Sequence, residues 1–192
     1  MIRGEATADA SQLIGHIFHR ADGARTVQAR LDRFVYSSLP PYDQWETLKA
    51  EAADQWSRYV DAMSPARVSR VAVRFVNRID VPREAFEVKD YLRTSLDLSP
   101  YLPQLMTGFF IQTEVPLPRH KATARITSAT AEPPSAGLSS VLLDIDAYRQ
   151  VDLALTDEGA SDALWSALDD LRDAKNFVFE ACITDATRGL ID

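Results

Sequence analysis

Arginines recur at every fourth position in the segment "RVSRVAVRFVNRID", which runs from Arg67 to Asp80. Arg70, Arg74 and Arg78 share one parity, and the apolar residues Val71, Val73, Phe75 and Ile79 share the other. This alternation predicts a strand with one face for a core and one cationic face. Guanidinium groups bind carboxylates and phosphates through paired hydrogen bonds. The row therefore suits either a ladder of ion pairs across a sheet or a site for an anionic ligand.

Carboxylates on other predicted strands supply partners for a ladder, whereas a ligand site requires the sheet to be curved. Asp144 and Asp146 lie on one parity of "LSSVLLDIDAYRQ", and Gln28, Arg30 and Asp32 share one parity of an earlier strand. We expect a mixed arrangement, in which Arg70 and Arg78 are ion-paired and Arg74 serves the ligand. The predicted ligand-binding residues are Arg30, Arg70, Arg74, Asn77, Arg78, Asp144 and Asp146.

Asn77 is the polar exception on the apolar parity of its strand. A buried amide needs hydrogen-bond partners. We expect it to bond the irregular segment after Pro82, or the strand to end there. An alternative is a site at the end of the strand, formed by Asn77, Arg78 and Asp80.

Other reactive residues form no recognisable catalytic or metal-binding set. Asp144-x-Asp146 is a weak signal for a hard cation such as magnesium. His16 and His19 are three apart on a predicted strand, so they point to opposite faces. Cys182 lies among apolar residues with no histidine in a local motif, which favours a buried thiol. The sequence has no glycine-rich phosphate loop, no G-x-S-x-G and no zinc spacing, so we predict no catalytic residue, metal or cofactor.

The elements that must position these residues follow from periodicity and turn signals. Residues 13–20 and 25–37 read as a hairpin around Asp22-Gly23. Helical spacing of apolar residues, including Trp45, Trp56 and Trp165, predicts two long helices whose tryptophans are largely buried against a sheet. The predicted strands are 67–82, 107–117, 120–131 and 138–150 (with 151–156 as an extension), and the predicted helices are 40–65, 86–93, 157–183 and a short one after Thr184-Asp185. This order predicts an α+β fold with a mainly antiparallel sheet of about six strands and two long helices over one face.

Four stretches resemble an uncharacterised, patchily distributed prokaryotic protein family: "TVQARLDRF" (26–34), "PYDQW" (41–45), "RFVNRI" (74–79) and "LDDLRDAKNFVFEACITD" (168–185). The resemblance supplies no active site. It implies a strand and helix before the hairpin in longer relatives, which are expected to be lacking here. A sheet without that strand has an unpaired edge, so we expect a homodimer.

Length and charge bound the remaining expectations. The 192 residues suit one α+β domain over 1–192, with residues 1–11 flexible. A formal charge of -7 disfavours nucleic acid and anionic membranes. One cysteine, no secretory signal and no membrane-length apolar run predict a cytoplasmic protein.

These features favour a non-catalytic interaction or regulatory module, with a protein partner as one possibility. Two alternatives stay open. One is a domain that binds a small anionic ligand on the arginine-lined sheet face. The other is an enzyme acting on a phosphorylated or nucleotide substrate, with Arg74 and Arg78 beside Asp144 and Asp146.

Overall fold

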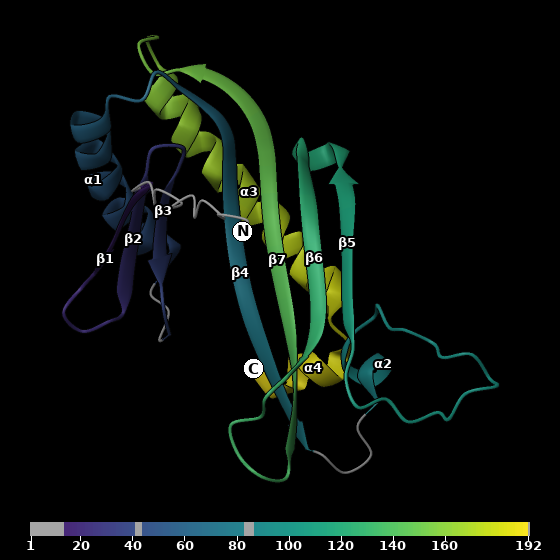
Figure 1. Ribbon diagram of the computed structural model, residues 1–192. Helices are drawn as coiled ribbons and strands as arrows, with labels where there is room; N and C mark the ends of the chain where they lie inside the picture. Colours follow the sequence, from purple (N-terminus) through teal and green to yellow (C-terminus); the bar gives the residue numbers. More distant parts are fainter. Residues whose placement is uncertain (1–13, 41–43, 83–86, 192) are drawn as a thin grey trace, which may run out of the picture. The chain divides into compact units, whose positions relative to one another are not determined.

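Seven strands form two separate antiparallel sheets in the computed structural model, which describes residues 14–40, 44–82 and 87–191 (Figure 1). Contacts divide the chain into two compact units, Met1–Pro65 and Ala66–Asp192. The antiparallel α+β class predicted from sequence is confirmed. The expectation of a single sheet is wrong, because no strand of the first unit pairs with a strand of the second among these residues. The single domain over 1–192 stays a prediction, and the flexible start at 1–11 lies outside the described residues.

The first unit is a three-stranded meander followed by a helix. Its strands are β1 (Gly15–His19), β2 (Arg25–Arg30) and β3 (Phe34–Ser38), paired in the order β1-β2-β3. The helix, α1 (Trp45–Met63), packs on β3. Phe34 contacts the rings of Trp56 and Tyr59, with ring centroids 5.5 and 5.4 Å apart.

The predicted second arm of the hairpin is in fact two strands. Residues 31–33 turn the chain, so Ala29 of β2 lies opposite Phe34 of β3. These paired residues are an odd number of positions apart, so the turn reverses the parity. Val27 and Ala29 therefore share the α1 face with Phe34 and not with Val35, which lies on the opposite face.

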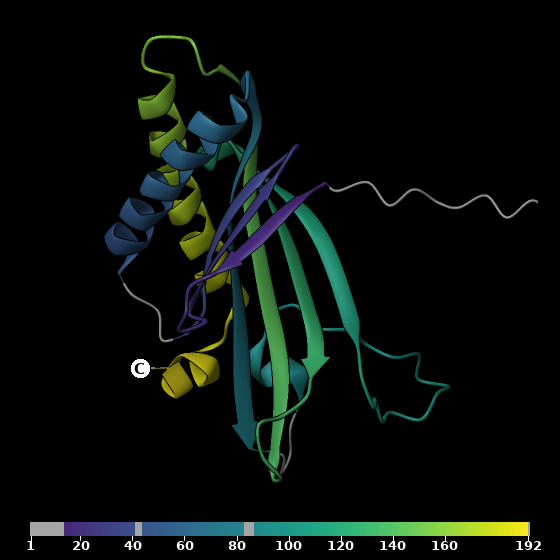
Figure 2. The ribbon, with the colours of Figure 1, turned by 60° about the vertical axis from the view of Figure 1, so that its left-hand side comes forward.

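The second unit holds a four-stranded sheet in the order β4-β7-β6-β5. The strands are β4 (Arg67–Pro82), β5 (Phe110–Leu117), β6 (Ala122–Ala131) and β7 (Leu138–Ala154). The helix α3 (Ala160–Cys182) runs along one face of this sheet, as Figure 2 shows, and packs on β7, β4 and β6. The remaining helices are α2 (Val88–Tyr91), the 3-10 turn η1 (Pro118–His120) and α4 (Asp185–Ile191).

The core of the second unit follows the predicted parity. Val71, Val73, Ile79 and Val81 of β4 are buried, and so are alternate residues of β7. Seven residues of α3 are buried, among them Leu164, Leu171 and Val178. The three tryptophans, expected to be largely buried, are each of intermediate exposure.

Candidate functional site

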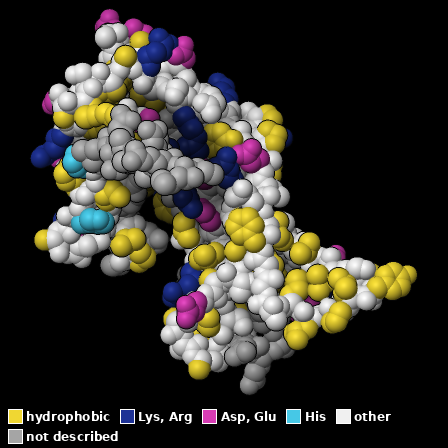
Figure 3. Space-filling model, in the orientation of Figure 1, with side chains coloured by type: hydrophobic (Ala, Val, Ile, Leu, Met, Phe, Trp, Pro, Cys, Tyr) yellow, Lys and Arg dark blue, Asp and Glu magenta, His cyan; other side chains and the backbone are white. Residues whose placement is uncertain are grey.

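The face of the four-stranded sheet opposite α3 carries the charges that the sequence singled out. We call it the charged face, and it consists of Arg70, Arg74, Arg78 and Asp80 on β4, Glu114 on β5, Arg125 on β6, and Asp144 and Asp146 on β7. Figure 3 shows cationic and anionic side chains interspersed over this sheet. Four positive and four negative residues leave the face with no formal net charge.

The strand register places opposite charges side by side. Arg74 lies opposite Asp146, Asp146 opposite Arg125, and Arg125 opposite Glu114, so charge alternates across four strands. Cross-strand pairs of opposite charge stabilise a sheet. On β4 the ion pairs form with carboxylates displaced along β7 from the directly opposite residue. Arg74 reaches Asp144 at 2.5 Å and Arg70 reaches Asp146 at 2.8 Å.

Arg74 is not the unpaired cation that we expected. Its Nε and Nη2 both donate to Asp144, at 2.9 and 2.5 Å, which is a bidentate arrangement. Hydrogen bonding to Asp144 raises the pKa of the Arg74 guanidinium. Its side chain is 62% exposed, so it lies on the surface of the sheet. Arg70 and Arg78 are paired as predicted, Arg78 with Asp80 of its own strand at 3.0 Å.

Tyr148 of β7 contacts both Arg70 on β4 and Glu114 on β5. The Arg70 guanidinium lies 4.4 Å from the centroid of its ring, a cation–π contact. Its hydroxyl donates to Glu114 at 3.2 Å. Glu114 also accepts from Arg125 at 2.7 Å, and this hydrogen bond lowers the pKa of the Glu114 carboxyl. A shallow, open cavity of about 300 Å³ lies beside Tyr148, but none of the seven predicted ligand-binding residues lines it.

Two predicted site residues lie elsewhere. Arg30 is on β2 of the other sheet, where it pairs with Asp32 at 3.1 Å. Asn77 is on the α3 side of β4, and its amide donates to the carbonyl oxygen of Leu143 on β7 at 3.1 Å. The strand does not end at Asn77, since β4 continues to Pro82. The segment directly after Pro82, the other expected partner, lies outside the described residues. Whether the remaining predicted residues bind a ligand stays a prediction.

The remaining groups that could do chemistry are the metal-ligating side chains, Cys182 and the histidines. Across the described ranges, no group of three or more His, Cys, Asp and Glu residues is placed to hold a metal ion. Cys182 is buried, and burial raises the pKa of its thiol. The His120 ring lies tilted against the Phe177 ring, with ring centroids 5.3 Å apart. In the part of the chain that the structure describes, no helix has the length and apolarity needed to cross a membrane.

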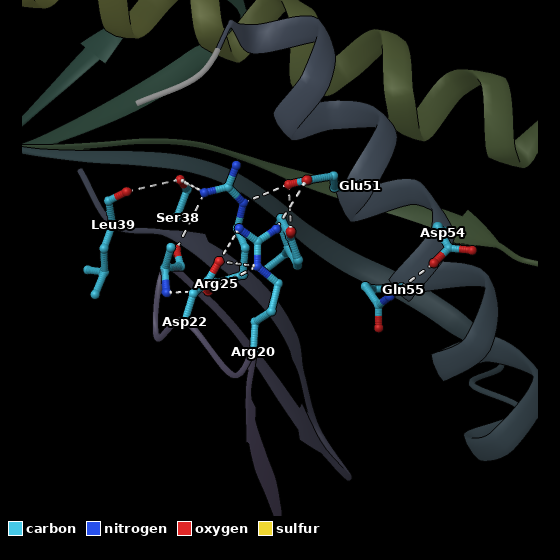
Figure 4. A network of polar contacts seen from close by, with 10 residues as sticks. Arg20, Asp22, Arg25, Ser38, Leu39, Glu51, Asp54 and Gln55 are labelled. Carbon is cyan, nitrogen blue, oxygen red and sulfur yellow. Dashed lines mark hydrogen bonds and ion pairs between the residues drawn. The ribbon is translucent and has the colours of Figure 1, made fainter. Parts of the chain in front are cut away.

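The sequence did not lead us to a partly buried polar network in the first unit, which Figure 4 shows. The Arg25 side chain is 6% exposed, and its Nε donates to Glu51 of α1 at 2.6 Å. Its Nη1 donates to Ser38 of β3 at 2.7 Å, and Tyr36 donates to Glu51 at 2.8 Å. Hydrogen bonds from Arg25 and then Tyr36 lower the pKa of Glu51. The network joins β2 and β3 to α1, so its role is to hold the unit together.

Comparison with protein-family models, with curated proteins and with solved structures gives no match to this chain. The family resemblance drawn from sequence therefore remains an expectation, and the site is argued from its own geometry.

Proposed function

We propose that the protein is a non-catalytic interaction or regulatory module that contacts a protein partner through the loop between α2 and β5. We call residues 96–106 the Tyr101 loop. The observation that carries the proposal is the exposure of its apolar side chains: Tyr101 is 95% exposed and Leu105 is 81% exposed. Leu96, Leu102 and Met106 are exposed as well. In Figure 3, hydrophobic side chains gather over this projecting loop.

Charged residues are absent from most of the Tyr101 loop and from the first half of β5. Residues 98–113 contain no charged side chain, in a chain in which 26% of residues are charged. Phe110, at the start of β5, extends the exposed apolar surface. Contiguous exposed apolar surface marks interaction sites in soluble proteins. Interface cores are enriched in aromatic residues and methionine and depleted in charge, which matches this composition.

The Tyr101 loop is ordered by its own hydrogen bonds. The backbone N–H of Leu102 donates to the carbonyl oxygen of Ser99 at 3.0 Å. The amide of Gln104 donates to the carbonyl oxygens of Ser99 and Leu102, at 3.0 and 2.8 Å. Pro100 and Pro103 restrict the backbone further. A segment that is already folded loses less conformational entropy when it binds, so more of the contact energy appears as affinity.

The ion pairs of the charged face favour this function over the two alternatives. An anionic ligand, or a phosphorylated or nucleotide substrate, would have to compete with Asp144 for Arg74 and with Asp146 for Arg70. Exposed pairs are individually weak, so competition is possible in principle. The zero formal charge of the face, however, supplies no long-range attraction for an anion.

The proposal carries three finer expectations from the sequence. The module is cytoplasmic, it belongs to a prokaryotic protein system, and it forms a homodimer. Its protein partner is a different chain, which binds the Tyr101 loop.

The test is affinity capture from an extract of the native host, followed by binding measurements with the purified candidate. The loop variant is Tyr101→Ser with Leu105→Ser. The matched control is Leu190→Ser with Ile191→Ser, which also replaces two exposed apolar residues, here on α4. We expect a protein captured by the wild type and the control and lost from the loop variant. Anchor residues at interfaces contribute more than about 1 kcal/mol each, so the purified partner should bind the loop variant at least tenfold more weakly. Equal binding of a purified partner to all three proteins would refute the role of the loop.

A further inference from the structure

The two units share one chain order. Each has a three-stranded meander followed by a helix that packs on the last strand: β1-β2-β3-α1 in the first unit and β5-β6-β7-α3 in the second. They differ at one edge. In the second unit β4 pairs with β7 along almost its whole length, whereas β3 stands at the edge of its sheet with no fourth strand among the described residues.

The open edge of β3 has backbone groups directed outward. The N–H of Leu39 donates to the carbonyl oxygen of Ala24 at 2.9 Å, so odd-numbered residues here direct their backbone groups toward β2. The N–H and C=O groups of Phe34, Tyr36 and Ser38 therefore point away from β2. Three N–H donors and three C=O acceptors therefore lie along the open edge of β3. The corresponding edge of β7, in the second unit, is the one that bonds β4.

The helix of the first unit is also incompletely covered. α1 has 19 residues, of which only Tyr59 is buried, whereas α3 has 23 residues, of which seven are buried. α3 packs on both β7 and β4, and α1 packs on β3. Leu48, Ala52 and Val60, on the apolar stripe of α1, remain partly exposed. α1 thus lacks the additional strand that β4 supplies to α3.

β3 also lacks the features that protect edge strands from pairing. Natural edge strands carry charges or prolines that prevent strand addition. β4 carries its arginines and ends at Pro82, and β5 contains Glu114 and Pro116. β3, with the sequence FVYSS, has neither. An uncharged strand meets no like-charge repulsion from its own copy.

We infer that β3 pairs antiparallel with β3 of a second copy of this chain. A two-fold pairing that uses the whole strand places Tyr36 opposite Tyr36 of the second copy, and Phe34 opposite Ser38. The axis is perpendicular to the sheet, so both α1 helices lie on the same face of a six-stranded sheet. Each α1 then gains a neighbouring strand, as α3 has β4. The inference gives the expected homodimer a defined interface, and it is independent of the Tyr101 loop.

The first test compares Ser38→Pro with Ser38→Ala by light scattering over a wide range of concentrations. Both variants lose the hydroxyl that accepts from Arg25. Only proline also removes the edge N–H, and its ring blocks a strand at this edge. We expect twice the chain mass of 21.4 kDa for the wild type and Ser38→Ala, and the single chain mass for Ser38→Pro with an unchanged circular dichroism spectrum.

A second test does not depend on proline. In the proposed register Val35 lies opposite Ser37 of the second copy as a non-hydrogen-bonded pair, with Cα atoms about 4.5 Å apart, within the range of a disulfide. Val35→Cys with Ser37→Cys should give a covalent dimer on mild oxidation, and Ile17→Cys on β1 should not. A dimer cross-linked only through Ile17→Cys would place the interface at β1 and overturn the inference. A wild type that stays monomeric would overturn it as well.

Discussion

Replacing Glu51 with glutamine should destabilise the first unit by about 2 kcal/mol. Glu51 accepts hydrogen bonds from Arg25 and Tyr36 through one oxygen, and the Arg25 side chain is 6% exposed. A hydrogen bond to a charged group contributes about 1.5–3 kcal/mol. The Glu51 side chain is 32% exposed, so solvent weakens the pair, and the lower half of this range applies. The amide keeps one acceptor oxygen but removes the negative charge that Glu51 places beside the buried Arg25 guanidinium.

Urea denaturation followed by tryptophan fluorescence measures this loss. Trp45 and Trp56 lie on α1, so a Trp165→Phe background restricts the signal to the first unit. The matched control is Asp144→Asn, which breaks an exposed pair in the second unit and is followed through Trp165 alone, in a Trp45→Phe, Trp56→Phe background. An exposed pair contributes about 0–1 kcal/mol. Equal losses at the two positions would show that burial of Arg25 does not set the strength of its pair.

The same variant makes a prediction about pH. The hydrogen bonds from Arg25 and Tyr36 lower the pKa of Glu51 in the folded protein. A depressed carboxyl pKa contributes stability above the unfolded-state value, about 4.3 for glutamate. That contribution is lost as the pH falls below this value and through the lower folded-state pKa. The wild type and Glu51→Gln should therefore converge in stability at acidic pH, and a difference that stays constant from neutral to acidic pH would refute the charge-based reasoning.

Three further outcomes follow from the second unit. Arg74→Ala should change the free energy of unfolding by no more than about 1 kcal/mol, since the pair with Asp144 is exposed; a clear gain in stability would instead indicate repulsion at an anion site. Leu171→Ala should cost about 2–5 kcal/mol in urea denaturation, because Leu171 is fully buried. Cys182 should react with a thiol reagent only when the protein unfolds, because burial hides the thiol and raises its pKa; rapid reaction of the native protein would contradict this placement.

Strand and helix periodicity predicted most elements, because side-chain parity reports local burial. The apolar parity of β4 and β7 and the stripe of α3 are found where the sequence placed them. Two features were not predictable in this way. The turn between β2 and β3 places Ala29 opposite Phe34, which reverses the parity and divides one predicted arm into two strands. The division into two sheets depends on which strands pair, and periodicity within a strand carries no information about its neighbours.

The same limit explains the errors at the candidate site. Arg74 was expected to be unpaired, but its partner is set by the register between β4 and β7, which brings Asp144 within reach on the diagonal. The buried Arg25 left a signal that the sequence reading did not use. Arg25 shares parity with Val27 and Ala29, and an arginine on an apolar parity requires a buried partner. Glu51 of α1 is that partner. The residue pattern of β2 does not specify that α1 packs on the neighbouring strand, so it could not identify Glu51.

The two surfaces of the second unit differ in what a binding partner must displace. On the charged face, a ligand contacts Arg74 only by separating it from Asp144. The lost Arg74–Asp144 ion pair therefore offsets much of the free energy gained from the new contact. In the Tyr101 loop, Gln104 already satisfies the carbonyl oxygens of Ser99 and Leu102. Burial of Tyr101 and Leu105 then removes apolar surface from water without breaking a bond within the loop, at about 25 cal/mol per Å². The net gain per contact is therefore larger at the loop, which is the physical reason to expect the partner there and not on the arginines.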